Sequence, residues 1–193
     1  MDRVEADLDL VDVRRVLAGD PEGFEGIVRR WQGPLINLAY RFVRDRGRAE
    51  DMAQEAFLKI FQQLARFRGD SAFSTWMFSV ALNVYRSSLR RRAPPSVPLD
   101  AVAGMVGRSA PQLALEEAQR EELVRRAVAA LPPRYRDALT VFYFKDKDLA
   151  ETARILEVPK GTAKALLHRG RKLLQRKLGV LGAAPSSARE AHA

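Results

Sequence analysis

The sequence contains no cysteine and only two histidines, His168 and His192. The missing thiols exclude disulfides, thiolate zinc sites and cysteine nucleophiles, and two histidines are too few for a multi-histidine metal centre. A P-loop, a dinucleotide-binding glycine motif and a nucleophile elbow are also absent. Adjacent acids such as Glu50 and Asp51 point in different directions on a helix and make poor acid/base couples. We therefore expect no catalytic residues, no cofactor and no metal.

The sequence also lacks any apolar run near the roughly 18 residues that a membrane span requires. Its acidic beginning, MDRVEADLDLVD, has no apolar core of a secretory signal. We expect a soluble, cytoplasmic protein. Positive charge is abundant instead, with a formal net charge of +9 over 193 residues. This balance favours polyanionic partners, nucleic acid before acidic membrane surfaces.

Strand alternation is absent, and apolar residues recur at helical spacing, which predicts an all-α fold. The first predicted helix covers residues 7–19. Its expected buried face consists of Leu8, Val11, Val13, Val16 and Leu17. Asp20 and Pro21 then supply a helix cap and a first-turn proline for the next helical stretch, residues 24–42.

Residues 49–64, AEDMAQEAFLKIFQQL, have the most regular helical pattern. The expected buried stripe is Met52, Ala53, Ala56, Phe57, Ile60, Phe61 and Leu64, and the opposite face carries Asp51, Gln54, Glu55, Leu58 and Gln62. A leucine between carboxylates suits docking of a basic partner helix. Isolated exposed leucines are nevertheless common, so spacing alone favours an ordinary solvated face.

Residues 67–92, FRGDSAFSTWMFSVALNVYRSSLRRR, combine a polar loop, an aromatic helix and a basic end. Aromatic rings beside phosphate-binding charge are typical of proteins that hold unpaired bases. A core helix with a solvated basic end explains the same pattern, and this stretch taken alone favours that simpler interpretation.

Residues 94–115 are rich in proline and lack periodicity, which predicts a flexible linker between two small helical domains at 7–93 and 116–178. Residues 179–193 are small and polar, and we expect a disordered tail. Within the second domain, 148–156 and 159–178 have the layout of a helix-turn-helix. Residues 160–178 contain seven Lys or Arg and no acid, which favours DNA contact by this helix over a basic surface helix.

The chain resembles the extracytoplasmic-function (ECF) sigma factors of bacterial RNA polymerase. Three stretches carry the resemblance in order: residues 49–64, residues 67–92, and LPPRYRDALTVFYFKDKDLAETARILEVPKGTAKALLHRGRKLL at the helix-turn-helix. It implies that domain 7–93 is sigma region 2 and domain 116–178 is sigma region 4. The implied partners are core RNA polymerase, through its largest-subunit coiled coil and its flap, promoter DNA in duplex and melted form, and an anti-sigma factor.

The resemblance also implies roles for individual residues. Polymerase binding would use Asp51, Gln54, Glu55 and Leu58, which reverses the preference for a solvated face. Minus-ten recognition and melting would use Gln63, Phe67, Arg68, Asp70, Ser71, Val80, Asn83, Arg86, Arg90 and Arg91, with Phe67 and Asn83 in a pocket for one flipped base. Phe73, Trp76 and Val84 would mainly hold the fold.

Minus-thirty-five recognition would use Lys164, Ala165, His168, Arg169 and Lys172. Here the sequence departs from the family pattern, because Ala165 and Leu166 stand where a serine and an arginine are common. Gly170 weakens a helix by up to about 1 kcal/mol relative to alanine. We expect an unusual upstream element, or one read through phosphates and DNA shape.

Two other functions remain compatible with the sequence. One is a stand-alone helix-turn-helix regulator that binds duplex DNA without polymerase. The other is a sigma-mimicking adaptor that binds an anti-sigma factor and has no promoter of its own.

Overall fold

The computed structural model describes residues 3–92, 112–144 and 148–183. The regular elements are α1 Arg3–Leu17, α2 Gly23–Val43, α3 Arg46–Gln63, the 3₁₀ helix η1 Leu64–Arg66, α4 Phe73–Arg92, α5 Gln112–Ala129, α6 Pro133–Tyr143, α7 Leu149–Ile155 and α8 Lys160–Ala183. The all-α prediction is confirmed, since the described residues contain no strand.

Two helix ends differ from the sequence-based boundaries. α5 begins at Gln112, inside the stretch expected to be linker, and α8 continues past Leu178 to Ala183. Most of that linker and the end of the tail lie outside the described residues. The chain forms two compact units, Met1–Pro94 with Thr140–Ala163, and Pro95–Leu139 with Lys164–Ala193.

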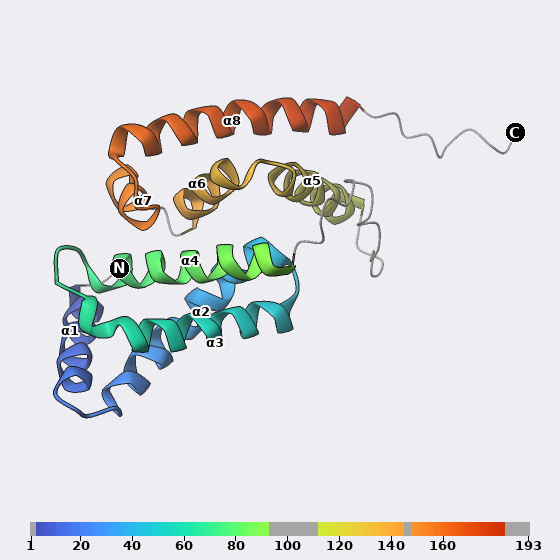
Figure 1. Ribbon diagram of the computed structural model, residues 1–193. Helices are drawn as coiled ribbons and strands as arrows, with labels where there is room; N and C mark the ends of the chain where they lie inside the picture. Colours follow the sequence, from blue (N-terminus) through green and yellow to red (C-terminus); the bar gives the residue numbers. More distant parts are fainter. Residues whose placement is uncertain (1–2, 93–111, 145–147, 184–193) are drawn as a thin grey trace, which may run out of the picture. The chain divides into compact units, whose positions relative to one another are not determined.

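In the first unit, α3 packs against both α2 and α4. Figure 1 shows α3 and α4 running side by side. Fully buried side chains on these three helices include Ile27, Leu35, Leu38, Ile60, Met77, Leu82 and Tyr85. The Tyr85 hydroxyl donates to the Leu35 carbonyl at 3.0 Å, and burial raises the pKa of Tyr85 far above its ordinary value. This bond fixes α4 to α2 inside an otherwise apolar core.

The predicted buried face of α1 is wrong for three of its five residues. Leu8, Val11 and Leu17 are 47%, 51% and 51% exposed, whereas Asp9 is only 1% exposed. Val13 is buried as expected, and Val16 is half-buried. The physical reason is a pair of donors on α2 that the periodicity of α1 does not reveal. The Trp31 indole donates to Asp9 at 2.9 Å, and the Arg30 guanidinium donates to the same carboxylate at 3.0 Å.

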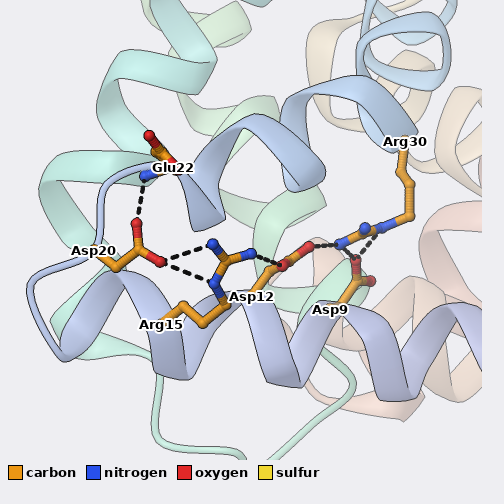
Figure 2. Close-up of polar contacts among 6 residues, drawn as sticks. All are labelled: Asp9, Asp12, Arg15, Asp20, Glu22 and Arg30. Carbon is orange, nitrogen blue, oxygen red and sulfur yellow. Dashed lines mark hydrogen bonds and ion pairs between the residues drawn. The ribbon is translucent and has the colours of Figure 1, made fainter.

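Arg30 connects the two buried carboxylates of α1 (Figure 2). Its Nη2 lies 2.6 Å from Asp12 Oδ2 and 2.9 Å from Asp9 Oδ1. Burial alone would lower the pKa of Arg30, but the hydrogen bonds to Asp12 and Asp9 outweigh burial and raise it. The network therefore keeps both carboxylates paired in a region with little water. We name Asp9, Asp12, Arg30 and Trp31 the α1–α2 network.

Asp20 holds the turn that precedes α2. Asp20 accepts the Glu22 backbone amide at 3.0 Å and lies 2.7 Å from Arg15 Nη2 (Figure 2). The helix begins at Gly23, with Glu22 at the cap position and no side-chain cap hydrogen bond, so the predicted cap at Asp20 lies two residues before the observed cap position. The Asp20 carboxylate nevertheless satisfies one backbone amide of this turn.

In the second unit, the buried side chains of α5, α6 and the turn between them form a small core that includes Ala127, Leu131, Tyr135, Ala138 and Leu139. α8 approaches this core at Gly170. A Cβ on Gly170 would lie 3.3 Å from Leu139 and 3.4 Å from Tyr135. The glycine that costs helix propensity thus permits close contact with α6.

Candidate nucleic-acid interface

The loop between α3 and α4 presents an aromatic edge. η1 ends the α3 segment, Phe67 is extended, and Gly69 takes a φ of +80°, a conformation that favours glycine. The Phe67 ring lies 5.4 Å from Phe73 and 5.5 Å from Trp76, measured between ring centroids. Phe73 is buried, while Phe67 is partly exposed. The buried ring therefore supports a second ring that has a solvent-accessible part.

Polar residues flank Phe67 in the sequence. Gln63 precedes it, and Arg68 and Asp70 follow it. Arg68 and Asp70 are exposed, whereas Gln63 and Ser71 are half-buried. The Ser71 hydroxyl donates to the Ala72 carbonyl at 3.3 Å. The residues close to Phe67 in sequence thus include a guanidinium, a carboxylate, a hydroxyl and an amide.

Trp76, Val80 and Asn83 follow one another at spacings of four and three residues on α4, so they share one face of the helix. Trp76 is half-buried, Val80 is only 8% exposed and Asn83 is exposed. We name Phe67, Trp76, Val80 and Asn83 the α4 stripe. Because Val80 is buried, the solvent-accessible groups of the stripe are parts of the Phe67 and Trp76 rings and the Asn83 amide.

The Asn83 amide is already hydrogen-bonded on both sides. Its Oδ1 accepts from Arg86 at 3.2 Å, and its Nδ2 donates to Glu157 at 3.4 Å. Glu157 follows the C-cap residue of α7 and takes a φ of +58°. The Asn83 amide retains a second donor hydrogen and a second lone pair that a base edge can engage.

Beyond Asn83, the end of α4 carries three arginines predicted to bind phosphates. Arg86 is half-buried, and Arg90 and Arg91 are exposed. Arg90 donates to the Ser87 hydroxyl at 2.9 Å, and Arg91 donates to the Glu55 carboxylate on α3 at 2.6 Å. α4 therefore passes from an aromatic edge to an amide and then to guanidinium groups.

The outer side of α3 brings together the residues predicted to bind polymerase. Asp51 and Gln54 are exposed, Glu55 is half-buried, and Leu58 is 66% exposed. Phe61 was expected in the buried stripe, and that expectation is wrong because Phe61 is 44% exposed. Its ring packs edge-on against Phe24 of α2 at 5.0 Å, which leaves its other side open to solvent. Phe61 thus extends the apolar part of this surface one turn beyond Leu58.

Asp148 caps the start of α7, as the capping-box spacing of Asp148 and Glu151 in the sequence predicts. Asp148 Oδ1 accepts the Glu151 backbone amide at 2.6 Å, and this bond is the main reason that the pKa of Asp148 is lowered. On α8, Ala163, Leu167 and Gly170 are buried. The residues predicted to read the upstream element are all exposed, namely Lys164, Ala165, His168, Arg169 and Lys172. A helical wheel of residues 160–178 places Ala163, Leu167, Gly170, Leu174 and Leu178 on the buried side. The first three are buried as this wheel predicts, whereas Leu174 and Leu178 are half-buried.

The comparisons with known proteins agree with this arrangement. A model of sigma-70 region 2 matches residues 27–94, and a model of sigma-70 region 4 matches residues 121–174. The RNA polymerase sigma-H factor of Pseudomonas aeruginosa is 33% identical over 187 residues, which cover 92% of this chain and 96% of that protein. The ECF RNA polymerase sigma-E factor of Escherichia coli K12 is 32% identical over 183 residues, or 90% of this chain and 95% of that protein. This chain belongs to the ECF sigma factor family.

A solved structure agrees with this ECF sigma factor at the level of fold. It is the co-crystal structure of the sigma factor RpoE with the anti-sigma factor NepR from Bartonella quintana, at a TM-score of 0.57 and 21% identity. The match covers 81% of this chain and 97% of the solved one. The α4 stripe and the outer side of α3 lie in the part matched by region 2, and α7 with most of α8 lies in the part matched by region 4.

Sigma factors are transcription initiation factors that bind core RNA polymerase and promoter DNA. Among the described residues, no group of three or more His, Asp or Glu is placed to hold a metal ion. None of the helices described is both long and apolar enough to cross a membrane.

Proposed function

We propose that this ECF sigma factor docks on the largest-subunit coiled coil of core RNA polymerase through the outer side of α3, directs the enzyme to its promoters, and starts melting by trapping one flipped minus-ten base. The proposal depends most on the α4 stripe. That stripe places an accessible aromatic ring and an amide before the arginines at the end of the same helix.

The α4 stripe matches the requirements of a base trap. Extruding a base from a duplex costs a few kcal/mol, which stacking and edge hydrogen bonds offset. Stacking on an aromatic side chain contributes about 1–3 kcal/mol per base. Phe67 supplies such a ring, and Asn83 supplies a donor and an acceptor for a base edge. In this proposal the DNA backbone on either side of the trapped base runs along α4, where its phosphates contact Arg86, Arg90 and Arg91.

Docking and upstream recognition use two further surfaces. On α3, Leu58 offers an apolar contact between carboxylates that suit a basic partner helix. On α8, Lys164, Arg169 and Lys172 contact phosphates and His168 reaches base edges of the minus-thirty-five element, while region 4 engages the polymerase flap. Ala165 offers only a methyl group, which suits an apolar contact such as a thymine methyl.

Regulation by an anti-sigma factor is part of this proposal, and its support is the co-crystal structure of RpoE with the anti-sigma factor NepR. The proposed place of action is the bacterial cytoplasm, at the nucleoid. This part is tested by purifying the chain from cells in which its promoters are inactive. We expect a second protein to co-purify with it and to block transcription when added to the holoenzyme.

The central experiment is run-off transcription with purified core polymerase and the full chain on genomic DNA, followed by sequencing of the transcripts. A sigma factor gives defined 5′ ends that need both components. A stand-alone regulator or a sigma-mimicking adaptor gives none.

On a promoter found in this way, Asn83→Ala should slow open-complex formation by about five- to tenfold, the factor for a lost hydrogen bond of about 1 to 1.4 kcal/mol. Affinity for core polymerase should stay unchanged. Asn37→Ala is the matched control, because Asn37 is an exposed asparagine of α2. Normal opening by Asn83→Ala would remove Asn83 from the trap.

A further inference from the structure

One ion pair joins the surface predicted to bind polymerase to the surface predicted to bind DNA. Arg91 Nη2 on α4 lies 2.6 Å from Glu55 Oε1 on α3, across 36 positions of sequence. The side chains are 60% and 44% exposed. Both residues therefore remain accessible to partners while they contact each other.

Other exposed ion pairs of the first unit have a different topology. Arg29 with Glu25, and Arg46 with Glu50, each lie one turn apart on a single helix. Such pairs add local support to a helix. The Glu55–Arg91 pair instead connects two helices, and each partner belongs to a different proposed interface.

The pair changes what each residue offers to its partner. A carboxylate 2.6 Å from a guanidinium partly cancels its field, so a phosphate is attracted less strongly to Arg91. The guanidinium likewise reduces the attraction of a basic helix for Glu55. Exposed ion pairs contribute only about 0–1 kcal/mol, so an incoming partner separates this one at low cost.

We propose that Glu55 and Arg91 form an exchangeable contact that couples polymerase docking to DNA binding. A basic polymerase helix that engages Glu55 releases Arg91 for the phosphate backbone of the melted strand. By linkage, a strand that engages Arg91 strengthens polymerase docking by the same factor. This coupling rests on the proposed function of the two surfaces.

The first test measures binding of the polymerase-free full chain to a fluorescent single-stranded oligonucleotide at low ionic strength, where a chain of net charge +9 binds a polyanion measurably. Glu55→Gln should raise the affinity about two- to fivefold, the range for an exposed ion pair. Glu25→Gln is the matched control, since it removes the same charge from a 2.6 Å pair with Arg29. It should raise the affinity by less than about 1.5-fold, the general effect of one screened charge.

The same substitution in an Arg91→Gln background identifies the cause. If the effect passes through Arg91, adding Glu55→Gln to the Arg91→Gln variant should raise its affinity for the oligonucleotide no more than adding Glu25→Gln does. An equal increase for Glu25→Gln and Glu55→Gln, or an increase that persists without Arg91, overturns the coupling. No increase for Glu55→Gln also overturns it.

The second test uses the holoenzyme at saturating core polymerase. Because polymerase then holds Glu55, wild type and Glu55→Gln should bind the oligonucleotide equally, while Arg91→Gln should bind more weakly. A persistent advantage of Glu55→Gln in the holoenzyme contradicts the release step. Run-off transcription by wild type distinguishes failure of the coupling from failure of the proposed sigma function. If core-dependent transcripts form but Glu55→Gln does not raise oligonucleotide affinity, only the coupling is rejected. If no core-dependent transcripts form, both proposals are rejected.

Discussion

Two arginine–carboxylate contacts of the first unit, one in the α1–α2 network and one between Glu55 and Arg91, have the same closest distance and different surroundings. Arg30 Nη2 and Arg91 Nη2 each lie 2.6 Å from a carboxylate oxygen, on Asp12 and Glu55 respectively. The Arg30 side chain is 22% exposed, whereas that of Arg91 is 60% exposed. The comparison shows that distance alone does not decide whether an ion pair holds the fold or remains available to partners.

Water accounts for the difference. A buried carboxylate that loses its partner cannot be solvated, so breaking such a pair costs several kcal/mol. An exposed pair exchanges its partner for water at little cost. The α1–α2 network is therefore part of the fold, and Glu55–Arg91 is an adjustable surface contact.

The largest expected effect comes from Arg30→Met, which leaves Asp9 without a guanidinium and Asp12 with only Arg15, at 3.7 Å. We expect a loss of about 3–5 kcal/mol in the free energy of unfolding. Urea unfolding followed by tryptophan fluorescence measures it directly, because Trp31 is bonded to Asp9. The control Arg29→Met removes a 75% exposed arginine and should cost less than about 1 kcal/mol. Equal losses would contradict the comparison.

A second, smaller effect tests how tightly the buried network is enclosed. A Cβ on Gly26 would overlap the Asp12 carboxylate, so Gly26→Ala should cost about 1–3 kcal/mol. Gly33 lies on the same helix, and an added Cβ there has no atom within 4 Å outside its chain neighbours. Gly33→Ala should change the free energy of unfolding by less than about 1 kcal/mol, because the gain in helix propensity is offset by contact of the Cβ with the Pro34 ring. Denaturant unfolding should therefore show a clear loss for Gly26→Ala and a small change for Gly33→Ala.

Asp148 extends the comparison to an exposed carboxylate held by a backbone amide. Its folded-state pKa is lowered, so its stabilisation of α7 is present above the ordinary aspartate pKa of about 3.9 and disappears as the pH falls through the lower folded value. Asp148→Ala should speed hydrogen exchange of the Glu151 amide at neutral pH. Asp148→Asn keeps a capping oxygen but has no carboxyl to protonate. In this variant, hydrogen exchange of the Glu151 amide should therefore lack the acceleration at acid pH that protonation of Asp148 causes in wild type. Identical acid profiles for wild type and Asp148→Asn would exclude this role of the carboxylate.

The smallest effect on stability is expected at Glu55 and Arg91. A double-mutant cycle with Glu55→Gln and Arg91→Gln should give a coupling of about 0.2–1 kcal/mol in the free energy of unfolding, and high salt should reduce it. A coupling as large as the loss from Arg30→Met would make the pair structural, and the contrast between the two sites would disappear.

Much of this architecture follows from local sequence patterns. The 3.6-residue periodicity of residues 49–64 predicted the buried side of α3 with the exception of Phe61, which packs on Phe24 and stays 44% exposed. A helical wheel of α8 predicted the burial of Ala163, Leu167 and Gly170, whereas Leu174 and Leu178 on the same side are half-buried. The pocket roles of Phe67, Val80 and Asn83 came from family resemblance, since spacing alone favours a core helix, and Trp76 was expected mainly to hold the fold.

The errors and omissions concern partners far apart in the chain. Buried aspartates on α1 depend on Arg30, which lies 21 residues beyond Asp9, and no pattern within α1 indicates it. The contacts of Glu55 with Arg91 and of Asn83 with Glu157 cross 36 and 74 positions of sequence. Hydrophobic periodicity specifies which side of a helix is buried, but it does not specify which charged groups meet once helices pack.

Gly170 has a consequence for redesigning promoter choice. Because α8 approaches Leu139 and Tyr135 at this glycine, an added side chain there would press on α6. The exposed positions Lys164, Ala165, His168, Arg169 and Lys172 lie on the same helix, so a shift of the helix would move all of them. Under the proposed function, new base preferences are best built by exchanging these outer residues while Gly170 and the buried Ala163 and Leu167 are kept.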